Sequence, residues 1–379
     1  MRILLIGEYS GFHNSLKHGL QALGHEVTLV GSGDSFKRFP VDINVGSDYF
    51  RRDWLREKIK VGWWKLTGRN LEDYIRLARF RESEHLITNH DIVQFINSNP
   101  FSCEAPVEWK MLDYLLRHNG KAFLVACGDD YPYAKYLTEA HEGYSILTPY
   151  HENVGLKNRF AHTFKYLQRP YQENYERLLE QCKAIIPSHT DFKMALKEEI
   201  KCTDIIPSAV VVENFELQQN HISQPIEIFM GINRGNYHKK GIPYFEKALE
   251  IIKIKYADQV NITIAENLPY QQYIKSYKKC HILLDQVLSY DQGYNALEAM
   301  AQGKVVFAGA GAPFLKAYGL KEAPLIDAQP DVDYLVQELS KLIDHPEIIF
   351  NLGLEAREFI AQHHDSIKIA KKYLELYNS

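Results

Sequence analysis

Short apolar runs, separated by longer stretches of helical periodicity, dominate the first half of the chain. Residues 2–6 form such a run, and leucines then recur at the spacing of one helix face as far as Gly24. A strand, a helix and a second strand within roughly 30 residues form the repeating unit of parallel sheets. The pattern predicts strands at 2–6 and 27–30 and in the runs that start at residues 91, 121 and 182. Ser188, after the last of these runs, is the expected N-cap of the following helix.

The second half repeats this pattern. Apolar runs that start at residues 226, 260, 281 and 304 predict strands, and 244–253 and 293–302 predict helices between them. Gly303 stands where the end of a helix needs a left-handed residue. From residue 346 to the end we expect a run of helices.

The length of the chain requires more than one domain. Single cores stop growing at roughly 250–300 residues, and the chain has 379. The polar segment 218–224 is a plausible hinge. We therefore predict an N-terminal domain at 1–215 and a C-terminal domain at 216–379, with the last helix able to cross back to the first domain.

Charge and cysteine content narrow the class of protein. A formal net charge of −4 gives the molecule as a whole no electrostatic reason to bind nucleic acid. The five cysteines contain no C-x-x-C pair, which indicates buried, reduced thiols of a cytoplasmic protein. No stretch approaches the roughly 18 apolar residues of a membrane span, so we expect any membrane contact to be peripheral.

The stretch 51–81 differs from the rest of the chain. It carries ten Lys/Arg and four Asp/Glu, a net charge of +6, and it includes three of the four tryptophans. Such a composition suits the headgroup region of an anionic membrane at the inner face. A solvated helical insertion explains it equally simply, and both interpretations remain open at this stage.

Two motifs in the second half indicate where the chemistry takes place. The first is G-I-N-R-G-N-Y-H-K-K-G at 231–241, which follows a predicted strand and offers Arg234 and Lys240 to neutralise a diphosphate. The second is L-S-Y-D-Q-G-Y-N-A-L-E-A-M-A-Q-G-K-V-V at 288–306. There Gly293 permits close backbone approach at a helix N-terminus, and Glu298 stands about one turn into that helix. A basic surface loop and an exposed helix residue are the ordinary alternatives for these two motifs.

The segment 226–311 resembles the donor-binding domain of retaining GT-B glycosyltransferases, especially family 4. Those enzymes carry a loop similar to G-R-x-x-x-x-K-G and the motif E-G-F-G…L-E-A-M-A-x-G-x-P-V-V. The resemblance implies an α/β, GT-B fold of two facing Rossmann-like, doubly wound parallel-sheet domains with a cleft between them. It also implies that Arg234 and Lys240 hold the donor diphosphate and that Glu298 holds the ribose.

The chain departs from the family motif at several positions. Tyr290 replaces the glutamate that contacts the transferred sugar, and the adjacent Asp291 is a candidate substitute. Lys304 replaces the proline of P-V-V. Asp285 and Gln286 end the preceding strand, where contact with the donor and a plain turn are both open interpretations.

The first half offers the acceptor side of the expected cleft. Gly11 closes the loop 7–11, which related enzymes place near the donor phosphates, although a simple strand-to-helix turn is the alternative. Asp129 and Asp130 follow the strand that ends near Cys127 and are the candidate catalytic residues. His13 and His151 are further candidates, but a lone histidine is more often structural.

We therefore expect transfer of a sugar from a nucleotide-diphosphate sugar to the hydroxyl of a glycan or lipid-linked acceptor. The resemblance implies retention by front-face substitution, in which the departing diphosphate helps to deprotonate the acceptor. No cluster has metal-ligand spacing, so we expect no metal and no cofactor besides the nucleotide sugar. The alternatives are a nucleotide-sugar epimerase of the same fold and a degenerate, non-catalytic scaffold subunit. A dinucleotide dehydrogenase is disfavoured, because 7–11 is not G-x-G-x-x-G.

Overall fold

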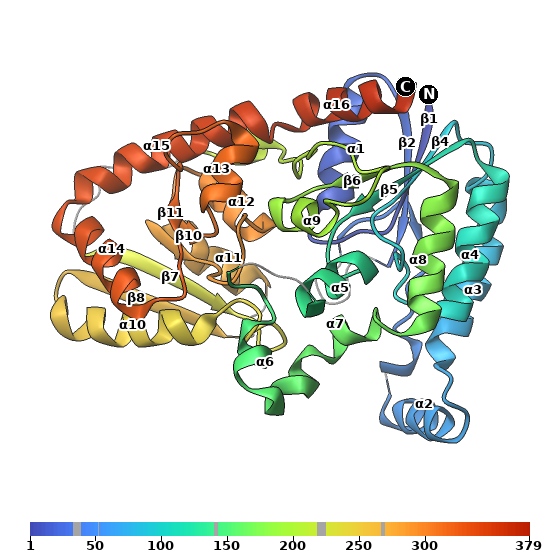
Figure 1. The fold of residues 1–379 in the computed structure, drawn as a ribbon, viewed down its shortest axis with the longest axis horizontal. Coiled ribbons are helices and arrows are strands. Elements are labelled where there is room, and N and C mark those ends of the chain that lie inside the picture. The colour runs from blue at the N-terminus through green and yellow to red at the C-terminus, as the bar shows by residue number, and fades with distance from the viewer. Residues whose placement is uncertain (33–38, 52, 140–142, 218–224, 267–269) are drawn as a thin grey trace.

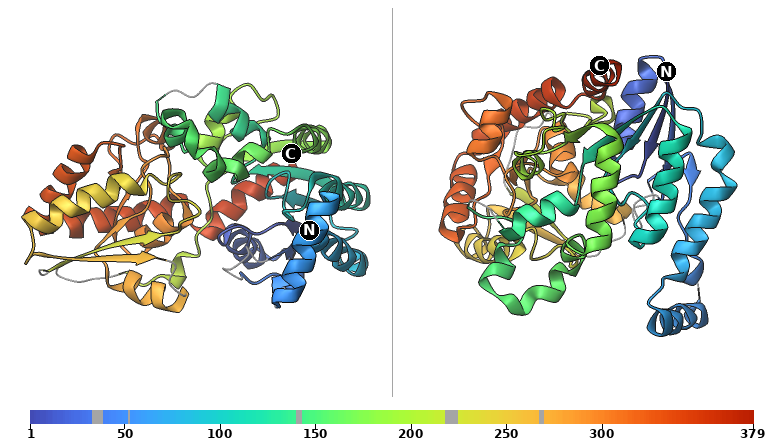
Figure 2. Two further views of the ribbon diagram at one scale, coloured as in Figure 1. Left: turned by 90° about the horizontal axis from the view of Figure 1, so that it is seen from below. Right: turned by 45° about the vertical axis from the view of Figure 1, so that its right-hand side comes forward.

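The computed structural model describes residues 1–32, 39–51, 53–139, 143–217, 225–266 and 270–379. These residues form two lobes, each built on a parallel sheet with helices on both faces (Figures 1 and 2). The prediction of two doubly wound parallel-sheet domains is confirmed. The predicted hinge, 218–224, lies outside the described residues.

The sheet of the first half has the strand order β3-β2-β1-β4-β5-β6, and every pair in it is parallel. Its strands are β1 (Arg2–Ile6), β2 (Glu26–Gly31), β3 (Ile43–Asn44), β4 (Ile92–Phe95), β5 (Lys121–Ala126) and β6 (Cys182–Pro187). The order reverses between β1 and β4, and ligands of open α/β sheets bind outside the carboxyl ends of the strands at such a point.

Helices cover both faces of this sheet. Leu77, Phe80, Met111 and Leu178 of three helices pack on one face, while Leu16 and Tyr373 pack on the other. The helices of this half are α1 (Phe12–Ala22), α2 (Trp54–Thr67), α3 (Leu71–Glu82), α4 (Ala105–His118), α5 (Tyr131–Glu139), α6 (Thr148–Glu152), α7 (Ala161–Lys165), α8 (Arg169–Gln181) and α9 (Thr190–Ala195).

The sheet of the second half has the order β11-β10-β9-β7-β8 and is also parallel. Its strands are β7 (Ile226–Ile232), β8 (Val260–Glu266), β9 (Ile282–Leu284), β10 (Val305–Ala308) and β11 (Ile326–Asp327). Its helices are α10 (Ile242–Lys255), α11 (Tyr270–Lys279), α12 (Tyr294–Ala301), α13 (Ala312–Tyr318), α14 (Val332–Asp344) and α15 (Pro346–His363).

The chain passes between the two halves twice. Ala209 packs in the core of the first half and Val210 in that of the second. After α15 the chain returns, and α16 (Ser366–Asn378) packs against α1 and the first sheet (Figure 1). The Val210 N–H donates to the His364 carbonyl at 2.7 Å, and the Ser366 N–H donates to the Val210 carbonyl at 2.9 Å. The two passages are therefore hydrogen-bonded to each other.

Several local predictions can be compared directly with the structure. Gly24 and Gly303 have φ values of 83° and 76° and follow α1 and α12, so both predicted helix ends are confirmed. The expected cap at Ser188 is wrong, because its hydroxyl donates to the Ala126 carbonyl and the His189 side chain caps α9 instead. All five cysteines are free thiols, and Cys103, Cys182 and Cys280 are buried.

Candidate functional site

A lysine and an aspartate meet at the carboxyl edge of the second sheet. Lys240 lies in the loop after β7 and Asp285 directly follows β9, and the Lys240 Nζ is 2.7 Å from the Asp285 Oδ1. The aspartate is 2% exposed. Its second oxygen, Oδ2, is buried and has no hydrogen-bond partner among the described residues. A buried carboxylate oxygen without a partner is costly, so a hydroxyl donor from a ligand would stabilise it.

The N-terminus of α12 faces the same carboxylate. Gly293 is the N-cap, with φ −81° and ψ 168°, and no side chain caps the helix. A Cβ built on Gly293 would lie 3.7 Å from the Asp285 Oδ2 and 3.8 Å from the Gln286 Oε1. The backbone itself therefore does not require glycine here. The free N–H groups of a helix start attract anions, so Lys240 and this helix end are two positive groups next to the Asp285 carboxylate.

Tyrosine and amide side chains complete this edge. The Asn295 Nδ2 donates to the Tyr273 hydroxyl at 2.7 Å and lies 3.4 Å from the Asp285 Oδ1. The Gln286 Nε2 donates to the Asp291 carbonyl at 2.9 Å. Sequence reasoning did not identify Asn295 or Tyr273 as site residues. Asn295 could have been recognised as a site residue only from its position in the first turn of the helix that follows Gly293.

Arg234 has a different partner from Lys240. Its Nε and Nη2 donate to the two carboxylate oxygens of Glu266, both at 2.6 Å, and its side chain is 50% exposed. The hydrogen bonds that Arg234 donates to Glu266 raise the pKa of Arg234 and lower the pKa of Glu266. Exposed ion pairs contribute little to stability. A diphosphate could therefore replace Glu266 as the partner of Arg234 at small cost.

Asp129 forms an ion pair between the two halves. Its Oδ2 lies 2.7 Å from the Nζ of Lys239, a residue of the loop after β7. The same oxygen accepts a hydrogen bond from the Thr163 hydroxyl at 2.7 Å. Burial alone would raise the pKa of Asp129, but Lys239, His162 and Thr163 together more than offset this, and the pKa lies below its ordinary value. Asp129 is thus a carboxylate that faces the second half.

The neighbouring Asp130 has a different environment. It is buried and accepts hydrogen bonds from the Ser98 N–H at 2.8 Å and the Ser98 hydroxyl at 2.5 Å. Burial raises its pKa, and these hydrogen bonds offset part of the shift. Asp130 therefore joins β4 to β5 within the first half, so of the two candidate catalytic residues only Asp129 faces the other half.

Tyr290 and Asp291 lie where the two halves touch. The Asp291 Oδ2 accepts hydrogen bonds from the N–H and hydroxyl of Thr190, both at 2.7 Å. The Tyr290 N–H donates to the Asp191 carboxylate, and the Tyr290 ring stacks on Tyr144 with centroids 4.7 Å apart. The structure therefore places both residues, which sequence reasoning assigned to the donor, in contacts between the halves.

Gly11 precedes α1 with φ 91°. Its N–H donates to the Glu8 Oε1 at 2.7 Å, and the Asn14 N–H donates to the Glu8 Oε2 at 2.9 Å. The N-terminus of α1 thus already holds a carboxylate from its own loop. His13 is buried beside it, with Nδ1 2.7 Å from the Gly7 carbonyl, and burial lowers its pKa to about 4. His151 is exposed, 3.1 Å from the Leu137 carbonyl.

Glu298 is half-buried on α12. Its charge contributes to raising the pKa values of Tyr273 and Tyr277, which places its carboxylate near both rings. The assignment of Glu298 to the ribose stays a prediction.

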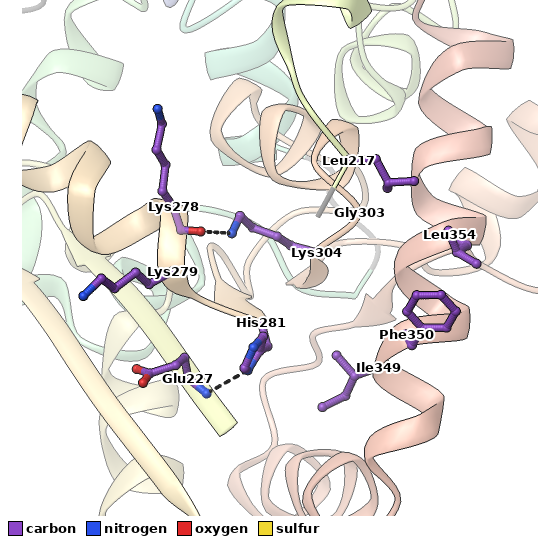
Figure 3. A pocket seen from close by; sticks show the side chains of 10 residues that line it. All are labelled: Leu217, Glu227, Lys278, Lys279, His281, Gly303, Lys304, Ile349, Phe350 and Leu354. Atoms are coloured by element: carbon purple, nitrogen blue, oxygen red, sulfur yellow. Dashed lines mark hydrogen bonds between the residues drawn. The ribbon is translucent and has the colours of Figure 1, made fainter. Parts of the chain in front are cut away.

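A cavity of about 400 Å³ opens at the opposite, amino edge of the second sheet (Figure 3). Lys304 and His281 line it just before β10 and β9. The Lys304 Nζ donates to the carbonyls of Lys278 and Cys280 at 3.0 and 2.7 Å, which satisfies the C-terminus of α11. Lys304, which replaces the family proline, therefore has a structural role here. Because ligands of open α/β sheets bind at the carboxyl edge, this cavity is distinct from the candidate site.

Two further findings concern the described residues as a set. No three His, Cys, Asp or Glu side chains among them are grouped in a way that could hold a metal ion. None of the helices that the structure describes has the length and apolarity needed to cross a bilayer.

Solved structures match the chain over its whole length. Sucrose-phosphate synthase from Thermosynechococcus elongatus has a TM-score of 0.59 and 16% identity, covering 100% of this chain and 98% of the synthase. HepE from Anabaena, in complex with UDP and glucose, has a TM-score of 0.56 and 12% identity, covering 100% of this chain and 99% of HepE. UDP-GlcNAc 2-epimerase from Neisseria meningitidis, bound to UDP-GlcNAc, has a TM-score of 0.50 and 13% identity, covering 99% of this chain and 99% of the epimerase.

No protein-family model and no curated protein matches the sequence. The neighbours have the GT-B fold, which confirms the fold prediction and, at these identities, shows the fold alone.

Proposed function

We propose that this chain is a glycosyltransferase that moves a sugar from a nucleotide-diphosphate sugar to the hydroxyl of a glycan or lipid-linked acceptor, with retention and without a metal. One observation carries the proposal. Lys240, the uncapped N-terminus of α12 and the unpartnered Oδ2 of Asp285 converge at the carboxyl edge of the second sheet. Two positive groups beside one hydrogen-bond acceptor are complementary to a diphosphate that carries a sugar.

Each group has a proposed role in donor binding. Lys240 and the α12 N–H groups hold the diphosphate, and Arg234 joins them by exchanging Glu266 for a phosphate oxygen. The Asp285 Oδ2 accepts a hydrogen bond from a sugar hydroxyl, because a carboxylate oxygen would repel the phosphates. Glu298 binds the ribose hydroxyls.

Charge stabilisation and positioning would supply most of the catalysis. The bond from the anomeric carbon to the diphosphate oxygen breaks, and the acceptor oxygen bonds to that carbon on the same face. The acceptor proton passes to an oxygen of the departing diphosphate. Lys240 stabilises the negative charge that develops there, and Asp129, ionised and facing the second half, positions the acceptor through its carboxylate.

The matched structures support a nucleotide-sugar substrate. The HepE structure with UDP-glucose matches 100% of this chain, and the TarM structure with UDP matches 80% of it. We therefore propose uridine nucleotides as the first donors to test, and a cytoplasmic enzyme that has access to them.

A panel of nucleotides in a thermal-shift experiment tests the proposal. UDP, GDP, ADP, CMP and their sugar conjugates would be added to wild type, Lys240→Ala and Arg234→Ala. A ligand at about 100 times its Kd adds about 2.7 kcal/mol to the free energy of unfolding. We expect one nucleotide diphosphate to stabilise wild type and to have little effect on Lys240→Ala.

Lys247→Ala is the matched control, because Lys247 is exposed on α10 in the same half. It should respond to the nucleotide as wild type does. A wild-type protein that none of the nucleotides stabilises at millimolar concentration would overturn the transferase assignment and favour the scaffold alternative.

An epimerase is the second candidate, because a Neisseria and a putative Listeria UDP-GlcNAc 2-epimerase match 99% and 98% of this chain. Product analysis separates the two activities. A transferase releases the nucleoside diphosphate together with a glycosylated acceptor, whereas an epimerase leaves the sugar attached to the nucleotide with inverted configuration at one carbon.

A further inference from the structure

Helix α2 buries none of its fourteen residues in the protein. It projects from the edge of the first half, on the side away from the second half (Figure 1 and the right-hand view of Figure 2). Seven of the eighteen large apolar side chains that are exposed in the described structure belong to this helix: Trp54, Leu55, Ile59, Val61, Trp63, Trp64 and Leu66. This concentration within 14 residues separates α2 from the rest of the surface, where exposed apolar side chains are dispersed.

The basic stretch 51–81 therefore divides into two parts. In α3, Asp73 and Arg76 are buried, and the Arg76 Nη1 donates to the Ser102 carbonyl at 2.9 Å. Leu77 and Phe80 of α3 pack in the core of the first half. The structure therefore accounts for α3 as part of the domain and leaves only α2 available to a partner.

The outward side of α2 carries two adjacent rows. Helical spacing aligns Leu55, Ile59 and Leu66 in one row. The same spacing aligns Trp54, Lys58 and Lys65 beside it, and the Lys58 Nζ lies 3.9 Å from the centroid of the Trp54 ring. An apolar row beside a row of lysines and tryptophan is the arrangement of a helix that lies in the interface of a membrane.

The energetics of α2 also favour an external partner. Isolated helices shorter than roughly 12–15 residues are marginal in water, and most helices are stabilised by packing of an apolar face. The face of α2 gains no such packing from the described protein. Transfer of the apolar row out of water would provide the missing stabilisation.

We propose that α2 docks the protein on an anionic lipid bilayer. Leu55, Ile59 and Leu66 enter the boundary of the acyl chains, and Lys58 and Lys65 contact lipid phosphates. From residue 53 to residue 69 the chain carries five Lys/Arg and two Asp/Glu, a net charge of +3. This charge is complementary to anionic headgroups and disfavours a second copy of the same helix as the partner. The proposal does not depend on the proposed transferase activity, although it fits a lipid-linked acceptor.

Vesicle co-sedimentation tests the proposal with the full chain. Wild type would be mixed with vesicles of phosphatidylcholine alone and with vesicles of equal parts phosphatidylcholine and phosphatidylglycerol. We expect binding to the anionic vesicles that weakens as salt is added, and a blue shift of the tryptophan fluorescence, since three of the four tryptophans lie in α2.

Two double variants separate the apolar and electrostatic contributions. Leu55→Glu/Leu66→Glu should lower the partition coefficient roughly 100-fold, and Lys58→Ala/Lys65→Ala about 30-fold. Ile251→Glu/Ile254→Glu on α10 is the matched control, because it makes the same charge change at two exposed apolar positions of the other half. It should bind as wild type does. Circular dichroism and thermal melting would establish that every variant is folded.

Three results would overturn the proposal. The first is wild type that binds neither type of vesicle, and the second is equal binding of folded Leu55→Glu/Leu66→Glu and wild type. The third is a dimer in light scattering that the Leu55→Glu/Leu66→Glu variant dissociates, because a second copy would then be the occupant of α2. None of these results depends on donor binding, so failure here and failure of the transferase assignment are distinguishable.

Discussion

The helices α1 and α12 start after a central strand of their respective sheets, yet their N-termini are satisfied in different ways. At α1, the Glu8 carboxylate accepts hydrogen bonds from the N–H groups of Gly11 and Asn14. At α12, no side chain caps the helix, and Lys240 lies nearby, paired with Asp285. The architecture provides an electropositive helix end in both halves. In the first half a carboxylate accepts hydrogen bonds from the helix end, whereas no side chain caps the helix end of the second half, where we propose that the ligand binds.

The largest expected effect concerns the second half. Lys240→Ala should lower kcat/KM for the cognate sugar nucleotide about 10²–10³-fold, because the substitution removes a cation from the site where charge develops. Steady-state kinetics with the donor identified by thermal shift would measure it, with Lys247→Ala as the control. Turnover at the wild-type rate in Lys240→Ala would show that the α12 site is not where the donor reacts.

The next effect concerns the first half. Glu8→Gln replaces a buried carboxylate that accepts hydrogen bonds from the Gly11 and Asn14 N–H groups and from the Asn14 side chain. We expect a loss of roughly 1–3 kcal/mol in the free energy of unfolding, measured by urea denaturation, with unchanged nucleotide affinity. Glu26→Gln, at an exposed carboxylate, should cost little. Weaker nucleotide binding in a folded Glu8→Gln protein would instead place the donor at both helix ends.

The pH dependence of stability sharpens the account of α1. Burial lowers the pKa of His13 from 6.5 to about 4, so the unfolded chain binds a proton between these values while the folded chain does not. The stability from neutral His13 is therefore present above pH 6.5 and is lost as the pH falls. We expect a loss of roughly 2 kcal/mol between pH 7 and pH 5. Urea titrations at both pH values would measure this change in the free energy of unfolding. The His13→Gln variant should lose the contribution of His13 and retain that of His364, whose pKa is also lowered to about 4. An identical slope in both proteins would contradict the assignment.

The smallest effect on stability is expected at the α12 N-terminus. Gly293→Ala places a Cβ 3.7 Å from the nearest atom on an extended backbone, so the free energy of unfolding should stay constant or rise by about 0.4–1 kcal/mol. Nucleotide affinity should fall, because the methyl group occupies the space proposed for the phosphate. Gly303→Ala is the contrasting variant. Its Cβ would lie 2.5 Å from Leu217 on a left-handed backbone, and it should destabilise the protein without acting on the ligand directly.

Local sequence patterns were sufficient to predict the central part of the fold. The apolar runs at β1, β5 and β6 are continuous because both faces of a parallel sheet are covered by helices. The edge strands β3 and β11 contain two residues each, too few for any periodicity. The division of 51–81 into an exposed α2 and a packed α3 also depends on tertiary contacts that composition does not report.

The candidate site was predictable only in part, for a physical reason. The proximity of Lys240 and Asp285 follows from loops that leave neighbouring strands at one edge of a sheet. The pairing of Asp129 with Lys239 joins residues that are 110 positions apart and depends on how the halves face each other. Arg234 and Lys240 were predicted to hold one diphosphate, and the pairing of Arg234 with Glu266 of the adjacent strand β8 could not be read from the loop sequence.

The double passage between the halves couples the two connections of the chain. Because Val210 is hydrogen-bonded to both His364 and Ser366, the two covalent connections must bend together at one line. A hinge motion of one half against the other would therefore have its axis near Val210. The same feature makes the first half discontinuous in sequence. A fragment that ends at residue 215 would lack α16 and would expose the apolar face of α1 on which that helix packs.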